Sequence, residues 1–305
     1  MMSYSYCLMM SEWNKVEEQE QRLFCWLGGS LPLPPALLKL VGCAHPPRPS
    51  LPSANYRKLA KLLEALETNA STADAMMGTM ECFGAGVGQW LKIAGDGKAH
   101  LLEAVLARFP GGVALELGSF VGYTALRLGR ALAQSVPGVP FRGFLTGEAA
   151  LSIEVDPIHG LFTRHCLMLA GLSSEVWLGH SSDLIPRLAE EFGDRLGLVF
   201  MDHRGTRFHS DLQLLEGHEL LMPWAGATQL VFDNTLKPGS PRLLWLLTHA
   251  LQPLQVASWA LDEFAHWNSE DWMTVATRCP PKKDSPISRW ASKIFMGWQP
   301  SRHLT

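Results

Sequence analysis

Apolar positions recur at two different spacings along this chain. Leu59, Leu62, Leu63 and Leu66 follow helical spacing and predict an amphipathic helix over residues 55–67. From residue 95 onward, a helix that Asp96 can cap is followed by short apolar runs alternating with stretches of helical spacing. The runs predict strands over 113–117, 151–155, 176–178, 196–201 and 228–232, and helices over 123–132, 183–192, 208–222 and 241–251, with one more that begins at Asp156-Pro157. This alternation indicates a doubly wound α/β fold, a mostly parallel sheet with helices on both faces.

Proline and glycine divide the chain further. The stretch 45–53 is rich in proline, which lacks an amide donor, so it cannot continue a helix and reads as a linker. We therefore expect an N-terminal extension and linker of unknown function over 1–54 and one catalytic domain over 55–305. The stretch 131–150 has the composition of an inserted loop. The longest apolar stretch, 23–44, is interrupted by glycines, prolines and Lys39, so no membrane span is expected.

Composition excludes several classes of protein. The 305 residues include 29 acidic and 26 basic side chains, so no excess of positive charge is available for nucleic acid. The 6 cysteines are scattered without a C-x-x-C pair, which disfavours a zinc site and a disulfide-stapled secreted module. No secretory signal is visible at the start of the chain. A cytoplasmic protein is the expectation.

Ligands of such folds bind beyond the carboxyl ends of the strands. After the first predicted strand, Gly118 and Gly122 let the backbone approach a ligand, and the following helix offers amides to an anionic group. A tight turn that needs glycine for its geometry alone is the alternative. Glu154 ends the second strand and could accept hydrogen bonds from both ribose hydroxyls of a nucleoside.

Oxygen-bearing side chains follow two later strands. Asp202 comes after the fourth predicted strand, and Asp233 and Asn234 come after the fifth. Two carboxylates and an amide oxygen brought together suit a hard cation such as Mg²⁺. Each cluster alone could instead cap the next segment or pair with arginines. Their occurrence at equivalent places favours the metal.

Five segments resemble, in order, the motifs of the catechol O-methyltransferase family. They are residues 116–124 (ELGSFVGYT), 153–157 (IEVDP), 179–186 (GHSSDLIP), 200–203 (FMDH) and 233–239 (DNTLKPG), and Gly95-Asp96-Gly97-Lys98 resembles the family's approach to the first strand. The resemblance covers about residues 89–272. It implies a Rossmann-like class I fold with seven strands, the last antiparallel, and an enzyme that uses S-adenosylmethionine and Mg²⁺ to methylate a small catechol-type substrate.

The resemblance also implies roles for individual residues. The methionine part of the cofactor would contact Glu116, Gly118, Tyr123 and Thr124, the ribose Glu154, and the adenine edge Ser181 and Ser182, while Ala94, Phe120, Gly122, Val155 and Asp202 complete the cofactor set. Asp202, Asp233 and Asn234 would bind Mg²⁺, which would hold both oxygens of a catechol and lower the pKa of the attacking hydroxyl. A flavonoid, a catecholamine or another vicinal diol would satisfy the same chelate, and the oligomeric state stays open.

One departure from the family touches the mechanism. Gly205 stands where the family has the lysine that takes the catechol proton, and Arg204 stands where it has a tryptophan. An arginine stays protonated and cannot act as the base. His203 and Lys237 are the candidate bases, and a lysine restored at 205 is expected to help if it fits there.

Two further expectations concern the residues around the methyl acceptor and the alternative functions of the chain. Glu270 is the candidate for the family's acceptor-side carboxylate, and Trp90 for a wall of the catechol site. A cofactor-binding protein that has lost turnover with its lysine is one alternative. A nicotinamide-dependent dehydrogenase is another, although hydride transfer needs no divalent ion and would leave the metal set unexplained.

Overall fold

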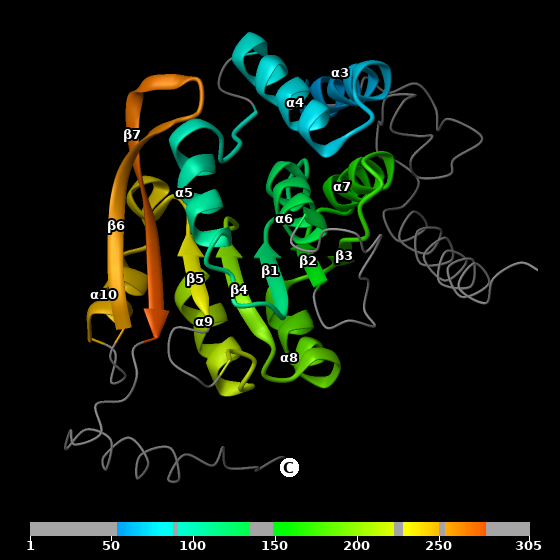
Figure 1. The fold of residues 1–305 in the computed structure, drawn as a ribbon. Helices are drawn as coiled ribbons and strands as arrows, with labels where there is room; N and C mark the ends of the chain where they lie inside the picture. The colour runs from blue at the N-terminus through cyan, green and yellow to red at the C-terminus, as the bar shows by residue number, and fades with distance from the viewer. Residues whose placement is uncertain (1–53, 88–90, 135–148, 223–227, 250–253, 279–305) are drawn as a thin grey trace, which may run out of the picture. The chain divides into compact units, whose positions relative to one another are not determined.

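A single seven-stranded sheet organises the chain in the computed structural model, which describes residues 54–87, 91–134, 149–222, 228–249 and 254–278 (Figure 1). The strand order is β3-β2-β1-β4-β5-β7-β6. The strands are β1 (Val113–Leu117), β2 (Ala149–Glu154), β3 (Glu175–Leu178), β4 (Leu196–Met201), β5 (Gln229–Phe232), β6 (Leu254–Glu263) and β7 (His266–Arg278). The pairs β1–β4, β2–β3 and β4–β5 are parallel, and β7 runs antiparallel to β5. The expected α/β fold and its antiparallel last strand are confirmed.

The helices follow the predicted alternation. They are α3 (Ala54–Asn69), α4 (Ala73–Val87), α5 (Asp96–Leu106), α6 (Tyr123–Gln134), α7 (Pro157–Leu169), α8 (Ser181–Phe192), α9 (Phe208–Gly217) and α10 (Pro241–His249), with a short π-helix, η3 (Thr235–Gly239). The bounds of β1 and β4 match the prediction, whereas α9 ends at Gly217 and not at 222. The apolar pattern did not predict α4, β6 or β7.

The described residues form two compact units, each built from separate segments of the chain. Unit 1 contains the residues up to Gly95 together with Gly118–His180 and Phe264–His266. Unit 2 contains Asp96–Leu117, Ser181–Glu263 and the residues from Trp267 onward. The expected division of the chain after residue 54 stays a prediction, because residues 1–53 lie outside the described part. The linker 45–53, most of the loop 131–150 and Trp90 lie outside it too.

Unit 1 is built around the helices α3, α4, α6 and α7. The leucines that predicted α3 are buried, together with Met76 and Met80 of α4 and Phe162 of α7. Asp156 caps α7 as expected, since its carboxylate accepts hydrogen bonds from the amides of Ile158 and His159. This cap fixes the helix at the carboxyl end of β2.

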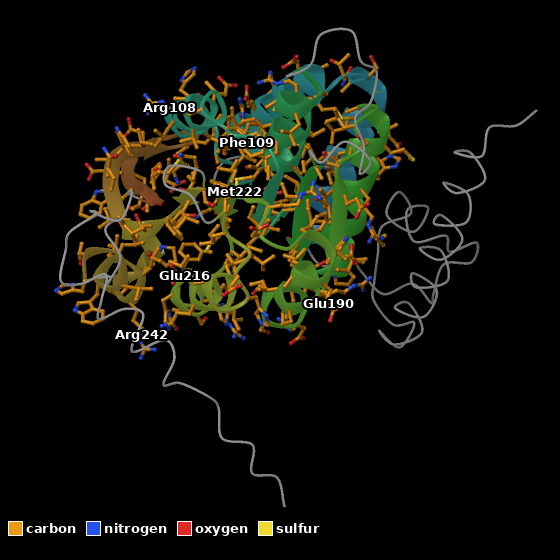
Figure 2. The ribbon with its side chains drawn as sticks, turned by 60° about the horizontal axis from the view of Figure 1, so that its bottom comes forward. Arg108, Phe109, Glu190, Glu216, Met222 and Arg242 are labelled. Carbon is orange, nitrogen blue, oxygen red and sulfur yellow. The ribbon has the colours of Figure 1, made fainter. Side chains whose placement is uncertain are left out.

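Unit 2 holds the central strands of the sheet. Every residue of β1 and β4 is buried, which explains why these strands read as continuous apolar runs. Figure 2 views the side from which these strands begin: Met222 is buried there, while Glu190 and Arg242 lie at the edge. The carboxyl ends of β1, β4 and β5, where ligands are expected, point the opposite way in Figure 1. No helix within the described ranges is long and apolar enough to cross a membrane.

Candidate functional site

In unit 1, the loop after β1 is held by tight backbone geometry. Gly122 has a φ of +81°, and a Cβ there would lie 2.9 Å from Cγ2 of Thr163. Phe120 also has a left-handed backbone, with a φ of 48°. The Gly118 amide donates to the Ile153 carbonyl at 2.8 Å. Glycine at 122 is therefore required both by backbone conformation and by the approach of α7.

Glu154 is fixed by this loop. Its Oε2 accepts the Phe120 amide and its Oε1 accepts the Asp156 amide, each at 2.9 Å. Each carboxylate oxygen keeps a lone pair for a further donor, as contact with two ribose hydroxyls requires. The next residue, Val155, has an apolar side chain that is 56% exposed. A flat ligand could pack on this exposed side chain.

Tyr123 uses its hydroxyl inside unit 1. The hydroxyl donates to Glu81 of α4 at 2.5 Å and accepts from Arg127 at 2.7 Å. Burial and the hydrogen bond to Glu81 raise the pKa of Tyr123 above its usual range. The side chain therefore joins α4 to α6, and only its backbone is left to meet a cofactor. Thr124 and Ala94 are buried.

In unit 2, Asp211 of α9 joins two of the expected residues. Its Oδ2 accepts the Ser181 hydroxyl at 2.8 Å and lies 2.6 Å from Nε2 of His203. Asp211 is 1% exposed. Ser182 donates to Asp183, its neighbour. The structure thus places His203 and Ser181 together, at the amino end of α8.

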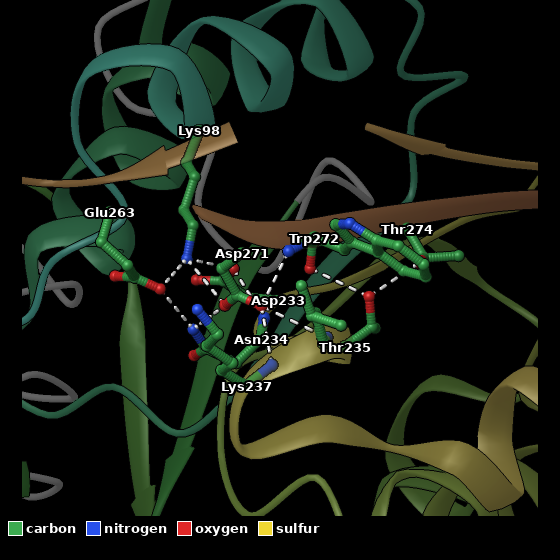
Figure 3. A network of polar contacts seen from close by, with 10 residues as sticks. Lys98, Asp233, Asn234, Thr235, Lys237, Glu263, Asp271, Trp272 and Thr274 are labelled. Carbon is green, nitrogen blue, oxygen red and sulfur yellow. Dashed lines mark hydrogen bonds and ion pairs between the residues drawn. The ribbon is translucent and has the colours of Figure 1, made fainter. Parts of the chain in front are cut away.

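A buried lysine gathers the charged residues at the end of β5. Nζ of Lys98 lies 2.8 Å from Oδ1 of Asp233, 2.8 Å from Oε1 of Glu263 and 3.4 Å from Oδ2 of Asp271 (Figure 3). Asn234 donates through Nδ2 to Glu263 at 3.0 Å and to Asp271 at 2.5 Å. We call these five residues the Lys98 cluster. Its members come from α5, β6, β7 and the end of β5, so the fold and not the local sequence brings them together.

Asp271 holds the backbone beside the cluster. Its Oδ1 accepts the amides of Leu236 at 3.2 Å and Lys237 at 2.9 Å. This carboxylate is completely buried, and its hydrogen bonds to Asn234 and to backbone amides keep its pKa below the usual range despite burial. Asp271 therefore stays ionised and fixes the start of η3.

Negative charge accumulates around Asp202 and Asp233. Burial and the negative charge of Asp233 raise the pKa of Asp202, and the buried Glu116 adds to the effect. Burial also raises the pKa of Asp233, against the pull of Lys98. Burial alone would lower the pKa of Lys98, but Asp233 and Glu263 raise it above its usual range. Lys98 is thus a permanent cation among carboxylates that repel one another.

The side chains of Glu270 and Lys237 are not members of the Lys98 cluster, and position 205 offers no side chain. Glu270 is exposed and accepts a bond from the Trp272 indole at 3.3 Å. Lys237 is exposed, and its backbone amide, not its ammonium, donates to Asp271. Gly205 is buried, and a Cβ there would lie 2.9 Å from the Gly239 carbonyl oxygen. Crowding by backbone, and not a positive φ, is what opposes a side chain at 205.

Sequence reasoning missed Lys98, Glu263, Asp271 and Asp211, although two of them carry a signal. Lys98 lies four residues before Leu102 and seven before Val105, so it occupies a core-facing position of α5. Asp271 alternates with Met273 and Val275 on β7, and all three are buried. Glu270, the residue before Asp271, is exposed, because successive side chains of a strand point to opposite faces.

The described residues contain no group of three or more His, Cys, Asp or Glu side chains that could hold a metal ion. The expected metal set has only two carboxylates, Asp202 and Asp233, with an amide as its third member. Nδ2 of Asn234 donates to two carboxylates, which leaves its Oδ1 available as a metal ligand. The residues present therefore suit an oxygen-preferring cation.

No family model matches the chain. Catechol O-methyltransferase from Mus musculus is 34% identical over 159 residues, which cover 51% of this chain and 54% of the mouse protein. The chain thus spans about half the length of that relative. A solved O-methyltransferase from Bacillus cereus in complex with SAH aligns with a TM-score of 0.51 at 14% identity, covering 80% of this chain and 97% of the bacterial one, and so supports the fold. Catechol O-methyltransferase from Sus scrofa is 33% identical over 153 residues, covering 49% of this chain and 74% of the pig protein. This chain therefore belongs to the catechol O-methyltransferase family.

Proposed function

We propose that the chain transfers the methyl group of S-adenosylmethionine to one hydroxyl of a catechol or related vicinal diol held by Mg²⁺. Family membership favours methyl transfer over the nicotinamide-dependent alternative. The observation that carries the proposal is the orientation of Asn234, whose amide nitrogen is held by Glu263 and Asp271 so that its oxygen is available beside Asp233. A side chain used only to cap η3 would not need this orientation, and Asn234 makes no capping hydrogen bond.

The surroundings of Asp202 and Asp233 support the metal. Burial and the negative charge of Asp233 raise the pKa of Asp202, which means that ionising both carboxylates together costs electrostatic free energy. A divalent cation offsets that cost. Bound there, Mg²⁺ would act as a Lewis acid that lowers the pKa of a substrate hydroxyl.

The chain's own residues orient the reactants. Glu154 is pinned by two backbone amides and would accept the ribose hydroxyls, while Val155 would pack on the adenine. Asp271 fixes the backbone of Leu236 and Lys237 and so the loop that follows the metal ligands. The catalytic contribution of these groups is positioning, because methyl transfer to an oxygen is a direct displacement.

The proton of the attacking hydroxyl needs an acceptor. Lys98 stays protonated beside three carboxylates, and Gly205 has no side chain. His203 pairs with Asp211 through Nε2, which leaves its buried Nδ1 without a hydrogen-bond partner among the described residues, and the Lys237 side chain is exposed. We infer that the proton passes to water or to Nδ1 of His203, so the rate should rise with pH more steeply than it would with the family's lysine.

A cofactor-binding protein with weak or no turnover is the second candidate. The crowded position of Gly205 favours it, since even a Cβ there would lie 2.9 Å from the Gly239 carbonyl oxygen and would force the backbone to shift. The two candidates differ in turnover and not in cofactor affinity.

The test is a methyl-transfer assay with radiolabelled S-adenosylmethionine and a simple catechol, with Mg²⁺, with EDTA, and with Mg²⁺ restored. We expect transfer that EDTA abolishes and Mg²⁺ restores, and poor support by Ca²⁺, which prefers a looser geometry. Asp202→Asn should behave like EDTA treatment. Full activity after chelation would remove the metal from the proposal. Binding of S-adenosylhomocysteine without transfer to any catechol would favour the second candidate.

A further inference from the structure

Lys98 is an unusual neighbour for a metal ligand. Its side chain is 1% exposed, and its ammonium lies 2.8 Å from Oδ1 of Asp233, one of the residues proposed to bind Mg²⁺. A lysine is almost never buried unless it is paired, and here it meets three carboxylates. Figure 3 shows that it enters from α5, while its partners enter from the sheet. A positive charge therefore lies where a cation is also expected.

Two opposite roles are physically possible for this charge. As a positioning group, Lys98 would hold Asp233 and, through Glu263, Asn234 in the geometry that a metal needs. As a counter-charge, it would neutralise part of the cluster and repel a divalent ion. The Lys98 ammonium and a bound Mg²⁺ would share the Asp233 carboxylate, since Oδ1 of Asp233 already pairs with Lys98. At such short separations in a poorly solvated site, charge repulsion exceeds the gain from fixing one side chain.

We propose that Lys98 is a resident counter-cation of the acidic cluster, which stabilises the fold in the absence of metal and weakens the binding of Mg²⁺. The inference rests on the proposed metal site. On this proposal, a residue of α5 controls the affinity for Mg²⁺, because the Lys98 ammonium neutralises part of the negative charge that would otherwise attract the ion. It also means that the chain folds without metal.

The test compares Mg²⁺ binding to the full chain and to Lys98→Met by isothermal titration calorimetry, with Mg²⁺ alone as the probe. Loss of the ammonium should tighten the Kd for Mg²⁺ by about tenfold or more. The metal-free Tm should fall by roughly 10 °C, because buried carboxylates lose their partner. Mg²⁺ should then raise the Tm of Lys98→Met more than that of the parent chain. Lys61→Met, on the exposed face of α3, is the matched control and should change neither quantity.

A second pair of variants keeps the test informative if Lys98→Met alone does not fold. Glu263→Gln removes one carboxylate from the cluster and leaves the proposed ligands intact. Adding Lys98→Met to Glu263→Gln restores the original charge of the cluster. The double variant should therefore fold without metal and bind Mg²⁺ about as tightly as the parent chain, and about tenfold or more tightly than Glu263→Gln alone.

The outcomes separate this inference from the proposed function. A Kd for Mg²⁺ that is unchanged or weaker after Lys98→Met, in both backgrounds, overturns the counter-cation role and leaves Lys98 as a positioning residue. If the parent chain methylates a catechol and binds Mg²⁺ under that outcome, only the inference fails. If no variant binds Mg²⁺, the inference and the metal site fall together. If removal of Lys98 tightens Mg²⁺ binding in a chain that methylates nothing, the inference stands and the proposed function fails.

Discussion

The loop after β1 in unit 1 and the Lys98 cluster in unit 2 are both candidate ligand sites, but they are built differently. The loop relies on backbone: a left-handed Gly122, amides that pin Glu154, and a close approach of α7. The Lys98 cluster relies on side-chain charge from four separate elements. A site of the first kind depends on glycine where the backbone is left-handed and on the one carboxylate that accepts two backbone amides. A site of the second kind is stabilised by ion pairs, so removing one charge lowers the stability of the fold.

The largest expected effect comes from breaking an ion pair of the cluster. Asp233→Ala should lower the free energy of unfolding by roughly 3–5 kcal/mol, because it leaves the buried Lys98 with an incomplete set of partners. Urea unfolding followed by circular dichroism measures the change. Asp194→Ala, at an exposed turn, is the control and should lie within about 0.5 kcal/mol of the parent. If the two variants are equally stable, the ion pair contributes nothing and the contrast between the two sites collapses.

The next effect concerns the backbone of the loop in unit 1. Gly122→Ala should cost about 2–4 kcal/mol, combining a left-handed conformation with overpacking against Thr163. Gly171→Ala is the matched control, since Gly171 has a φ of +66° and nothing within 4 Å of its Cβ position. It should cost only about 1–2 kcal/mol. Equal losses in urea unfolding would mean that the approach of α7 is not what requires glycine at 122.

The next effect concerns cofactor affinity. Glu154→Ala should weaken S-adenosylhomocysteine by about 1–3 kcal/mol, the range for a hydrogen bond to a charged group. Isothermal titration calorimetry measures it. Glu154→Gln keeps an acceptor and should lose less than Glu154→Ala. A folded Glu154→Ala chain with unchanged affinity would contradict the role of this carboxylate at the ribose.

The same contrast explains what the sequence could predict. The loop after β1 and the end of β2 are contiguous motifs, so Gly118, Gly122 and Glu154 could be named from residue types and strand ends. The Lys98 cluster joins residues as far apart as Lys98 and Asp271, and no local pattern pairs them. Lys98 was hidden because its charge masked a core-facing position of α5. The resemblance implied an antiparallel last strand, but no apolar pattern placed it over β7, so the inward face of Asp271 could not be assigned. Crowding at Gly205 depends on the backbone of η3 and has no signal in the sequence.

Position 205 in unit 2 tests whether crowding by backbone prevents a side-chain base there. From the sequence, a lysine restored at 205 was expected to raise the rate near neutral pH, since a positioned base contributes ~10²–10⁴-fold. The structure changes that expectation, because a Cβ at 205 would lie 2.9 Å from the Gly239 carbonyl, which is backbone and cannot rotate away. Gly205→Ala should cost about 1–3 kcal/mol, the range for overpacking, because the Gly239 oxygen belongs to the backbone and must shift to admit a Cβ. Gly205→Lys should lose a similar amount of stability and should not raise the rate of methyl transfer.

The measurement is a pH–rate profile for the parent, Gly205→Ala and Gly205→Lys with one catechol and saturating Mg²⁺, together with urea unfolding of each protein. A rate gain near neutral pH that only Gly205→Lys shows would mean that η3 yields to the new side chain and that a side-chain base works at this position. A parent profile with a plateau through neutral pH would mean that the chain already has a base, and Lys237→Met would then be the next variant to measure.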